Sequence, residues 1–152
     1  MKRAFLTLLY KLYTLQFIFT RPITMGVRVL LVRDGQVLLV KHIYQPYWYL
    51  PGGAMKRGET PEQAARREAF EEAGASLGEI EFFGVFSQFI ENRSDHILVF
   101  ACENFTFTGK SDFEIESVQL FPIHSLPEDI APGNKRRIEE YLQGSQVKAG
   151  KW

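Results

Sequence analysis

The stretch Gly53–Ala75 reads GAMKRGETPEQAARREAFEEAGA, and the rest of the chain is organised around it. It has the order of a glycine-bearing loop, a helix start, a helix and a glycine stop. Thr60 can cap the helix, Pro61 suits its first position, and Gln63 can close a capping box back onto Thr60. Gly74 fits the left-handed position that ends many helices. The stretch therefore predicts a loop followed by a helix that ends just before Gly74.

Three carboxylates share one face of this helix, because Glu68, Glu71 and Glu72 are spaced i, i+3 and i+4. Like charges at this spacing cost roughly 0.2–0.5 kcal/mol per pair. A hard divalent cation such as Mg²⁺, which prefers oxygen ligands, would relieve that repulsion. A solvated acidic face on an ordinary helix gives the same pattern, so the carboxylates alone do not decide between the two. Small residues on another face suit close packing against a sheet: Ala64, Ala65, Ala69 and Ala73.

The whole stretch resembles the Nudix box, whose pattern is G-x5-E-x7-R-E-U-x-E-E-x-G-U with U a bulky aliphatic residue. In this chain the pattern falls on Gly53, Glu59, Arg67, Glu68, Ala69, Glu71, Glu72, Gly74 and Ala75. Every fixed residue is present at the right spacing. Both U positions are alanine, smaller than the family usually places there, which affects helix packing and not the chemistry.

The resemblance implies an α/β/α sandwich of the α+β class, with a mixed sheet between helices. It also implies hydrolysis of a nucleoside diphosphate linked to another group, with Mg²⁺ or Mn²⁺ as cofactor. The implied metal ligands are the carboxylates of Glu68, Glu71 and Glu72 and the carbonyl of Gly52. Arg67 would pair with Glu59 and hold the loop against the helix.

The general base is left open by the resemblance, because family members differ. Some use the glutamate that matches Glu68, and others use a glutamate from a later loop. Glu114 and Glu116 are the later candidates here, and a Glu-Ile pair favours Glu114. We therefore predict Glu68, Glu72, Arg67 and Glu114 as the catalytic residues.

The substrate is predicted to be a small nucleotide, with Arg57 and Tyr47 among its binding residues. Tyr47 belongs to a group of four aromatic residues before Leu50-Pro51-Gly52-Gly53 that can stack a base or brace the loop. The proline typical of family members that hydrolyse ADP-ribose is missing from 87–92. A nucleoside triphosphate or a nucleoside diphosphate sugar is favoured, and a triphosphorylated or capped RNA end gains no support. The alternative is a non-catalytic nucleotide-binding module, although such members usually lose box glutamates.

Length and charge predict one ordinary globular domain. The chain has 152 residues, and its 18 Lys and Arg residues balance 18 Asp and Glu residues. This balance gives no reason to expect a stable nucleic-acid partner or an anionic membrane surface. Cys102 is the only cysteine, which excludes an intramolecular disulfide and favours a reducing, cytoplasmic setting with a buried thiol.

Residues 1–22 lie outside the box-containing domain, for which we predict the bounds 23–143. They predict an apolar helix, with Leu6, Leu9, Tyr13 and Phe17 at helical spacing and further apolar residues around the circumference. Lys11 interrupts the run, which argues against a signal peptide and a membrane span. Packing on its own domain, packing across a homodimer and membrane attachment remain open, with membrane attachment the least favoured.

The remaining elements follow from alternation and turn residues. Asp34-Gly35 indicates a hairpin turn, and 91–95 a polar turn. We expect strands over 27–32, 36–41, 81–90, 96–107 and 114–121. Asn134 can cap a last helix over 135–142 with a solvated basic face, and 144–152 is expected to be a flexible tail.

Overall fold

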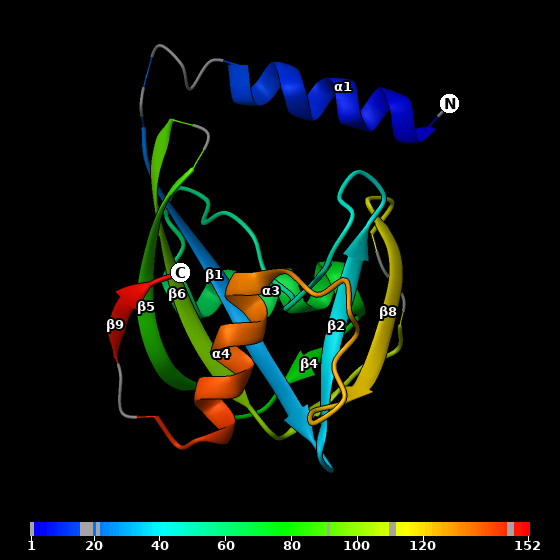
Figure 1. The fold of residues 1–152 in the computed structure, drawn as a ribbon, viewed down its shortest axis with the longest axis vertical. Helices are drawn as coiled ribbons and strands as arrows, with labels where there is room; N and C mark the ends of the chain where they lie inside the picture. The colour runs from blue at the N-terminus through cyan, green and yellow to red at the C-terminus, as the bar shows by residue number, and fades with distance from the viewer. Residues whose placement is uncertain (1, 16–19, 21, 91, 110–111, 146–147) are drawn as a thin grey trace.

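A mixed β-sheet forms the centre of the fold (Figure 1). The computed structural model describes residues 2–15, 20, 22–90, 92–109, 112–145 and 148–152. Within these residues the sheet has seven strands in the order β3-β2-β1-β6-β5-β9, and β8 pairs with β2. They are β1 (Ile23–Arg33), β2 (Gln36–His42), β3 (Trp48–Tyr49), β5 (Glu81–Ile90), β6 (Arg93–Cys102), β8 (Ile115–Pro122) and β9 (Ala149–Lys151). A small second sheet pairs β4 (Ser76–Leu77) with β7 (Phe105–Thr106), and the helices are α1 (Lys2–Leu15), α3 (Pro61–Ala73) and α4 (Pro132–Leu142).

The sheet divides into two halves that share only the β1–β2 hairpin. β1 pairs in parallel with β6 along Ile23–Leu31, but it pairs with β2 only at Val32 and Arg33. Asp34 and Gly35, with φ of 52° and 71°, form the predicted turn. Beyond it β2 leaves β1 and runs antiparallel to β8. Figure 1 shows the two halves opening towards the end that carries α1.

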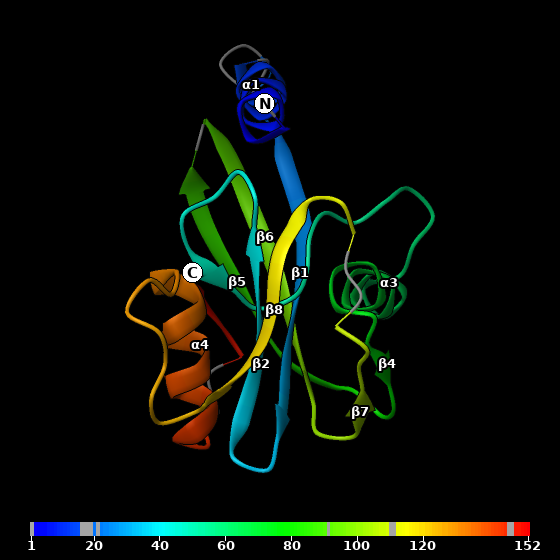
Figure 2. The same cartoon turned by 90° about the vertical axis from the view of Figure 1, so that its right-hand side faces the viewer.

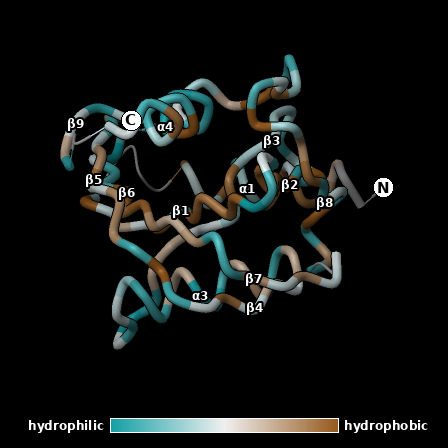
Figure 3. Tube along the Cα trace, turned by 90° about the horizontal axis from the view of Figure 1, so that it is seen from below, coloured by the Kyte–Doolittle hydropathy of each residue, from teal (hydrophilic) through white to brown (hydrophobic). Residues whose placement is uncertain are grey.

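Helices α3 and α4 cover opposite faces of the sheet (Figure 2). Strand alternation explains this, because Val27, Val29 and Leu31 belong to the apolar cluster that contains the alanines of α3. Leu30 belongs instead to the cluster that contains Ile138 of α4. Hydrophobic residues accordingly concentrate in the strands between the two helices (Figure 3). The predicted α/β/α sandwich with a mixed sheet is confirmed.

The structure corrects two predictions around α4. The helix begins at Pro132, with Ala131 as its N-cap, because proline is preorganised for the first helical position. Asn134 lies inside the helix, and its side-chain oxygen accepts the backbone N–H of Leu50 at 2.9 Å. The basic face is not wholly solvated either, because Arg137 is 1% exposed and its guanidinium stacks on Phe86 at 3.7 Å.

The predicted strand over 96–107 is two strands, since β6 ends at Cys102 and β7 begins at Phe105. The strand also starts earlier than predicted, at Arg93, where the polar turn was expected. Cys102 is buried, as predicted, and burial raises the pKa of its thiol.

The expected flexible tail at 144–152 is wrong for its last residues. Ala149–Lys151 form β9, which pairs in parallel with β5. The N–H of Val85 donates to Lys148 O at 2.8 Å, and that of Trp152 donates to Ser87 O at 3.0 Å. The edge strand of a sheet has unpaired N–H and C=O groups that can pair with any nearby extended segment. The polar residues of the tail give no sign of this pairing in the sequence.

Helix α1 leaves most of its apolar surface exposed. Leu6 is buried, and Tyr10 stacks on Tyr44 with ring centroids 5.5 Å apart. The exposed large side chains, each 46–60% accessible, are Phe5, Leu8, Leu9, Leu12, Tyr13 and Leu15. Phe17 of the predicted helix lies outside the described residues. Among the helices described, none is long and apolar enough to cross a membrane.

Candidate active site

The loop before α3 is shaped by glycine. Gly52 has φ of 146°, and a Cβ atom there would stand 2.1 Å from Val27 O. The loop can therefore press against β1, where the N–H of Val27 donates to Gly53 O and that of Val29 to Pro51 O, both at 2.9 Å. Gly53 likewise leaves room for the Glu68 carboxylate, which a Cβ would meet at 2.8 Å. Loop and helix are thus in direct contact.

The predicted capping of α3 is confirmed. The Thr60 hydroxyl accepts the N–H of Gln63 at 3.2 Å, and the Gln63 side chain accepts the N–H of Thr60 at 2.9 Å. Gly74 ends the helix with φ of 62°. The helix presents Ala64, Ala65 and two further alanines, all fully buried, to the sheet. Beside these alanines, the carboxylates of Glu68 and Glu72 reach the loop at Gly53 and Gly52.

A cleft of about 310 Å³ lies beside these glutamates. Its wall includes Glu68, Glu71 and Glu72, whose side chains are 13%, 39% and 9% exposed. Glu114 and Asp112, from the segment that leads into β8, line the other side. The fold therefore brings five carboxylates from two distant segments to one cleft.

Arg67 holds the carboxylates of this cleft together. Its guanidinium donates to Glu59 at 2.5 and 2.9 Å, to Glu68 at 2.6 Å and to Glu71 at 2.9 Å. It also donates to Ala54 O in the loop at 3.1 Å. The Arg67 guanidinium lowers the pKa of Glu59 to about 2. The predicted pairing of Glu59 with Arg67 is present in the structure.

Glu72 is the most buried acid of the cleft. One of its oxygens accepts the N–H of Gly52 at 2.9 Å, and the other lies 3.4 Å from Nε2 of His42. Burial raises the pKa of Glu72 to about 8. Burial, together with the charge of Arg28, lowers the pKa of His42 to about 4. The imidazole that faces Glu72 is therefore neutral, and within the described part of the chain Nδ1 of His42 has no hydrogen-bond partner.

Glu114 is held by the residues that follow β2. The Tyr44 hydroxyl donates to a Glu114 carboxylate oxygen at 3.2 Å, and the N–H of Ile43 donates to Glu114 O at 2.9 Å. The pKa of Tyr44 is raised by burial and by the adjacent carboxylate, so Tyr44 stays a hydrogen-bond donor. Glu116 is exposed and does not line the cleft.

The carboxylate oxygens of the cleft suit a hard divalent cation. Across the residues that the structure describes, however, no three His, Cys, Asp or Glu side chains converge as metal ligands do. Glu68 and Glu71 bind Arg67 instead, and the Gly52 carbonyl accepts a hydrogen bond from Arg28 at 2.7 Å. The metal ligand set stays a prediction.

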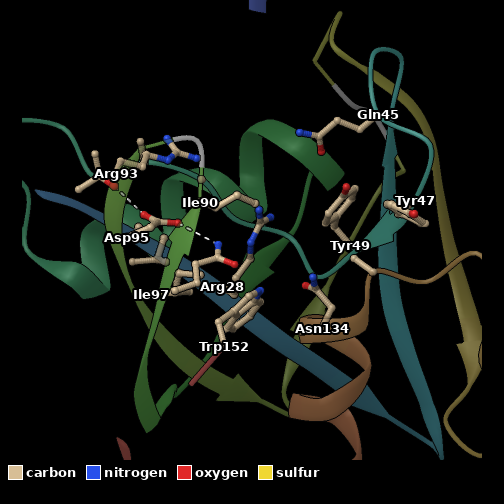
Figure 4. A pocket seen from close by; sticks show the side chains of 18 of the residues that line it. Arg28, Gln45, Tyr47, Tyr49, Ile90, Arg93, Asp95, Ile97, Asn134 and Trp152 are labelled. Carbon is tan, nitrogen blue, oxygen red and sulfur yellow. Dashed lines mark hydrogen bonds between the residues drawn. The ribbon is translucent and has the colours of Figure 1, made fainter. Parts of the chain in front are cut away.

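A second cavity, of about 690 Å³, adjoins the glutamate cleft, because Ala54 lines both (Figure 4). Its wall mixes aromatic and polar side chains from α1, β1, β5, β6, the segment 44–49, α4 and the last residue. Tyr47, which is 43% exposed, packs edge-on to Tyr49 here. The cleft and the cavity meet at Ala54, and the two together are called the depression beside the loop.

Arg28 connects the two parts of this depression. It lines the larger cavity, and its Nη1 donates to Leu50 O at 2.9 Å as well as to Gly52 O. Its guanidinium carbon lies 5.6 Å from the ring centroid of Tyr49. A fixed positive charge therefore stands between the aromatic walls and the carboxylates.

Comparison with known proteins gives the family. The NUDIX domain model matches residues 21–141, most of the chain. The chain is a member of the Nudix family. A putative 8-oxo-dGTP diphosphatase of Bacillus subtilis is 31% identical over 124 residues, which is 81% of this chain and 83% of that protein. An ADP-ribose pyrophosphatase of Methanocaldococcus jannaschii is 28% identical over 73% of this chain and 68% of its own length.

Solved Nudix structures have the same fold. A MutT NUDIX hydrolase from Burkholderia pseudomallei superposes with a TM-score of 0.70 at 26% identity, over 78% of this chain and 96% of that one. A NUDIX hydrolase from Nitrosomonas europaea gives 0.73 at 23% identity over 83% and 93% of the two chains. α1 and β9 both lie outside the Nudix match.

The structure gathers most of the predicted site residues. Arg67, Glu114 and the three box glutamates line the cleft, the Gly52 carbonyl faces Arg28, and Tyr47 lines the adjoining cavity. Arg57 is exposed and lines neither depression. Their roles in this Nudix protein remain predictions.

Sequence reasoning missed several residues of the site. Arg28 interrupts the aliphatic run of β1, and that interruption is a signal that could have identified it. His42 and Tyr44 follow from neither spacing nor motif, since only the β2–β8 pairing brings them to the glutamates. Trp152 carried no signal at all.

Proposed function

We propose that this protein is a metal-dependent pyrophosphohydrolase that cleaves the P–O–P bond of a nucleoside diphosphate linked to another group. A nucleoside triphosphate is the first candidate, and a nucleoside diphosphate sugar the second. Membership of the Nudix family and the pyrophosphatase activities named for relatives support the reaction class. Oxygen-rich clefts with a divalent cation suit phosphoryl chemistry, because the charge that builds on phosphoryl oxygens must be neutralised.

The observation that carries this proposal is the continuity of the two depressions at Ala54. The carboxylate cleft suits a cation-bound pyrophosphate, and the larger cavity offers aromatic and polar side chains to a nucleoside. A nucleotide has both a phosphate chain and a nucleoside, so it fits a site in which the cleft and the cavity meet. The sequence match to a putative 8-oxo-dGTP diphosphatase favours a triphosphate over a sugar conjugate.

In the proposed reaction water attacks a phosphorus atom, the bond to the bridging oxygen breaks, and that oxygen leaves on the other phosphate. Glu114 receives the proton of the attacking water, and the Tyr44 hydroxyl keeps its carboxylate oriented. Glu68, Glu71, Glu72 and the Gly52 carbonyl would hold Mg²⁺ or Mn²⁺, which neutralises phosphate charge and activates water when bound. Arg67 orients two of these carboxylates and ties them to Glu59.

The test is phosphate release, after coupling to pyrophosphatase or phosphatase, across a panel of nucleotides. The panel contains ribo- and deoxynucleoside triphosphates, diphosphate sugars, dinucleoside polyphosphates and ADP-ribose, each with Mg²⁺, Mn²⁺ or EDTA. Cleavage of one class that requires the metal supports the proposal and names the substrate group. Nucleotide binding by calorimetry without cleavage of any class would favour the non-catalytic binding module.

We also propose that α1 packs against a second copy of the chain. Its exposed apolar side chains form a larger apolar surface than the single hydrophobic residues that are normal on protein surfaces. Leu6 and Tyr10 hold the helix on its own domain. Burying this face in a homodimer would remove it from water.

Mass in solution tests the dimer. The full chain is expected to be dimeric, and Leu8→Glu with Leu12→Glu monomeric, because both side chains are more than half exposed. A matched control replaces Thr14, which is only partly exposed on α1, by Glu. A monomeric wild type that sediments with anionic vesicles would overturn the dimer in favour of membrane attachment. A reducing, cytoplasmic location is part of the proposal, and fractionation of cells checks it.

A further inference from the structure

Hydrogen bonds hold the backbone N–H and the backbone carbonyl of Trp152, the last residue. β9 aligns Ala149–Lys151 with β5, and the N–H of Trp152 donates to Ser87 O at 3.0 Å. The guanidinium of Arg136 donates to Trp152 O, also at 3.0 Å. Trp152 therefore has a defined position although it follows a short strand.

The indole of Trp152 rests on α4 and the sheet. A Cβ atom at Gly133 would stand 2.2 Å from the indole nitrogen, so this residue must be glycine for the ring to lie here. The Phe86 ring packs edge-on at a centroid distance of 6.4 Å, and the Arg137 guanidinium lies 5.7 Å from the indole. These contacts support one side of the ring and leave the residue only half-buried.

Trp152 also lines the wall of the larger cavity. Figure 4 shows Trp152 with Arg28 and Asn134 around this space. Arg28 in turn donates to Gly52 O, whose N–H binds Glu72. The residues thus lead from an aromatic ring, through a positive charge, to the carboxylates, which is the order base, phosphate, cleavage site in a nucleotide.

We propose that Trp152 is a specificity-determining residue that stacks on the base of the nucleotide substrate. This inference rests on the proposed function and adds to it the part of the substrate that Trp152 recognises. Every base offers a flat π face to an aromatic ring. Trp48 cannot serve, because it is 9% exposed and packed edge-on to Phe121 at 4.8 Å. Trp152 lies outside the Nudix match, so it would give this chain a selectivity that the box does not set.

Tryptophan fluorescence tests the contact without turnover. The chain has two tryptophans, and Trp48→Phe leaves Trp152 as the only emitter. In EDTA, titration with purine nucleoside monophosphates is expected to quench this emission saturably, while inorganic pyrophosphate leaves it unchanged. In Trp152→Phe, the emission of the buried Trp48 is expected to stay unchanged during the same titration. Monophosphate binding seen by calorimetry with no change in Trp152 emission would overturn the inference.

Kinetics give the second readout. Trp152→Ala is expected to raise KM for the nucleotide roughly 5- to 150-fold, the range for loss of one stacked base, with kcat little changed. Trp152→Phe should restore most of the affinity, which a purely structural role of the indole nitrogen would not predict. Phe89→Ala is the matched control, because Phe89 is 74% exposed on β5 and absent from the cavity wall.

The outcomes separate the two proposals. Hydrolysis with an unchanged KM in Trp152→Ala would overturn the role of Trp152 and leave the reaction class intact. Absence of hydrolysis across the nucleotide panel, with monophosphates still quenching Trp152, would overturn the enzyme and keep the base contact. Melting temperatures of the variants show whether a loss of affinity is a loss of fold.

Discussion

The two parts of the depression are built in opposite ways. The carboxylate cleft takes most of its chemistry from 23 consecutive residues, Gly53–Ala75, in which a loop and a helix lie against each other. The adjoining cavity collects side chains from both ends of the chain and from several strands between them. The first can be read from local spacing, whereas the second exists only after the sheet has formed. Reaction chemistry and substrate selection therefore rest on different physical foundations.

The largest expected effect is a loss of stability in the loop of the carboxylate cleft, the region that is built from local sequence. Gly52→Ala places a Cβ 2.1 Å from Val27 O at a φ of 146°, so we expect a loss of roughly 3–5 kcal/mol from strain and overpacking. Gly58→Ala is the matched control, since its φ of 83° is also positive but no atom lies within 4 Å of the added Cβ. About 1–2 kcal/mol is expected there. Urea denaturation measures both, and equal losses would refute the role assigned to close packing.

Next in size is the chemistry of the same region. Glu72→Gln keeps the volume of the side chain and an oxygen that accepts the N–H of Gly52, so the fold should persist. Glutamine cannot supply the ionised carboxylate that a bound cation would favour. We therefore expect metal-dependent hydrolysis to fall on the order of 10²- to 10³-fold, as with the loss of one preorganised charge-stabilising group. Glu62→Gln, in the exposed first turn of α3, is the control. Near-normal turnover in Glu72→Gln would remove Glu72 from the metal site.

A smaller effect is expected at the residue that joins the two regions. Arg28→Lys keeps the charge but replaces the rigid, planar guanidinium by a flexible ammonium group. The guanidinium lies over Tyr49, and its Nη1 donates to both Leu50 O and Gly52 O. We expect roughly 1–3 kcal/mol of lost stability by denaturation, with KM raised more than kcat is lowered. A variant with unchanged stability and kinetics would show that the two depressions act independently.

The smallest expected effect is the loss of one ion pair's contribution to stability at low pH. The Arg67 guanidinium lowers the pKa of Glu59 to about 2, below its ordinary value of 4.5, so the pair stabilises the fold above about pH 4.5. That contribution is lost as the pH falls through the folded value. Glu59→Gln should therefore be less stable than the wild type at pH 7, and the difference should shrink towards pH 2. Melting temperatures across this range test it, and a constant difference would exclude the ion pair as the cause.

The sequence predicted what local physics determines. The capping box of Thr60 and Gln63 and the left-handed Gly74 need only neighbouring residues, and the structure has both. The Asp34-Gly35 turn is equally local and is also present. Glu68, Glu71 and Glu72 share a helix face by spacing alone. The α/β/α arrangement, by contrast, came from the resemblance to the Nudix box, which local spacing could not supply.

What the sequence did not predict depends on distant partners. Asn134 looked like a helix cap but accepts the N–H of Leu50, which lies 84 positions earlier. Arg137 looked solvated, although Phe86 and the main chain of Lys151 surround it. Trp152 lies in a segment with no periodicity, and only the free edge of β5 explains its position. In each case the partner was fixed by topology, and no property of the residue itself identified that partner.

The parallel pairing of β1 with β6 also sets the order in which the molecule can assemble. Ile23 pairs with Ser94, so the whole box segment lies inside the loop that this pairing closes. Non-local sheets of this kind fold slowly, over roughly milliseconds to seconds. During that time α3 has no sheet to cover, while the apolar side chains of α1 are already in water. Refolding at high protein concentration is therefore expected to lose material to aggregation, and a chain that begins at residue 21 should recover better.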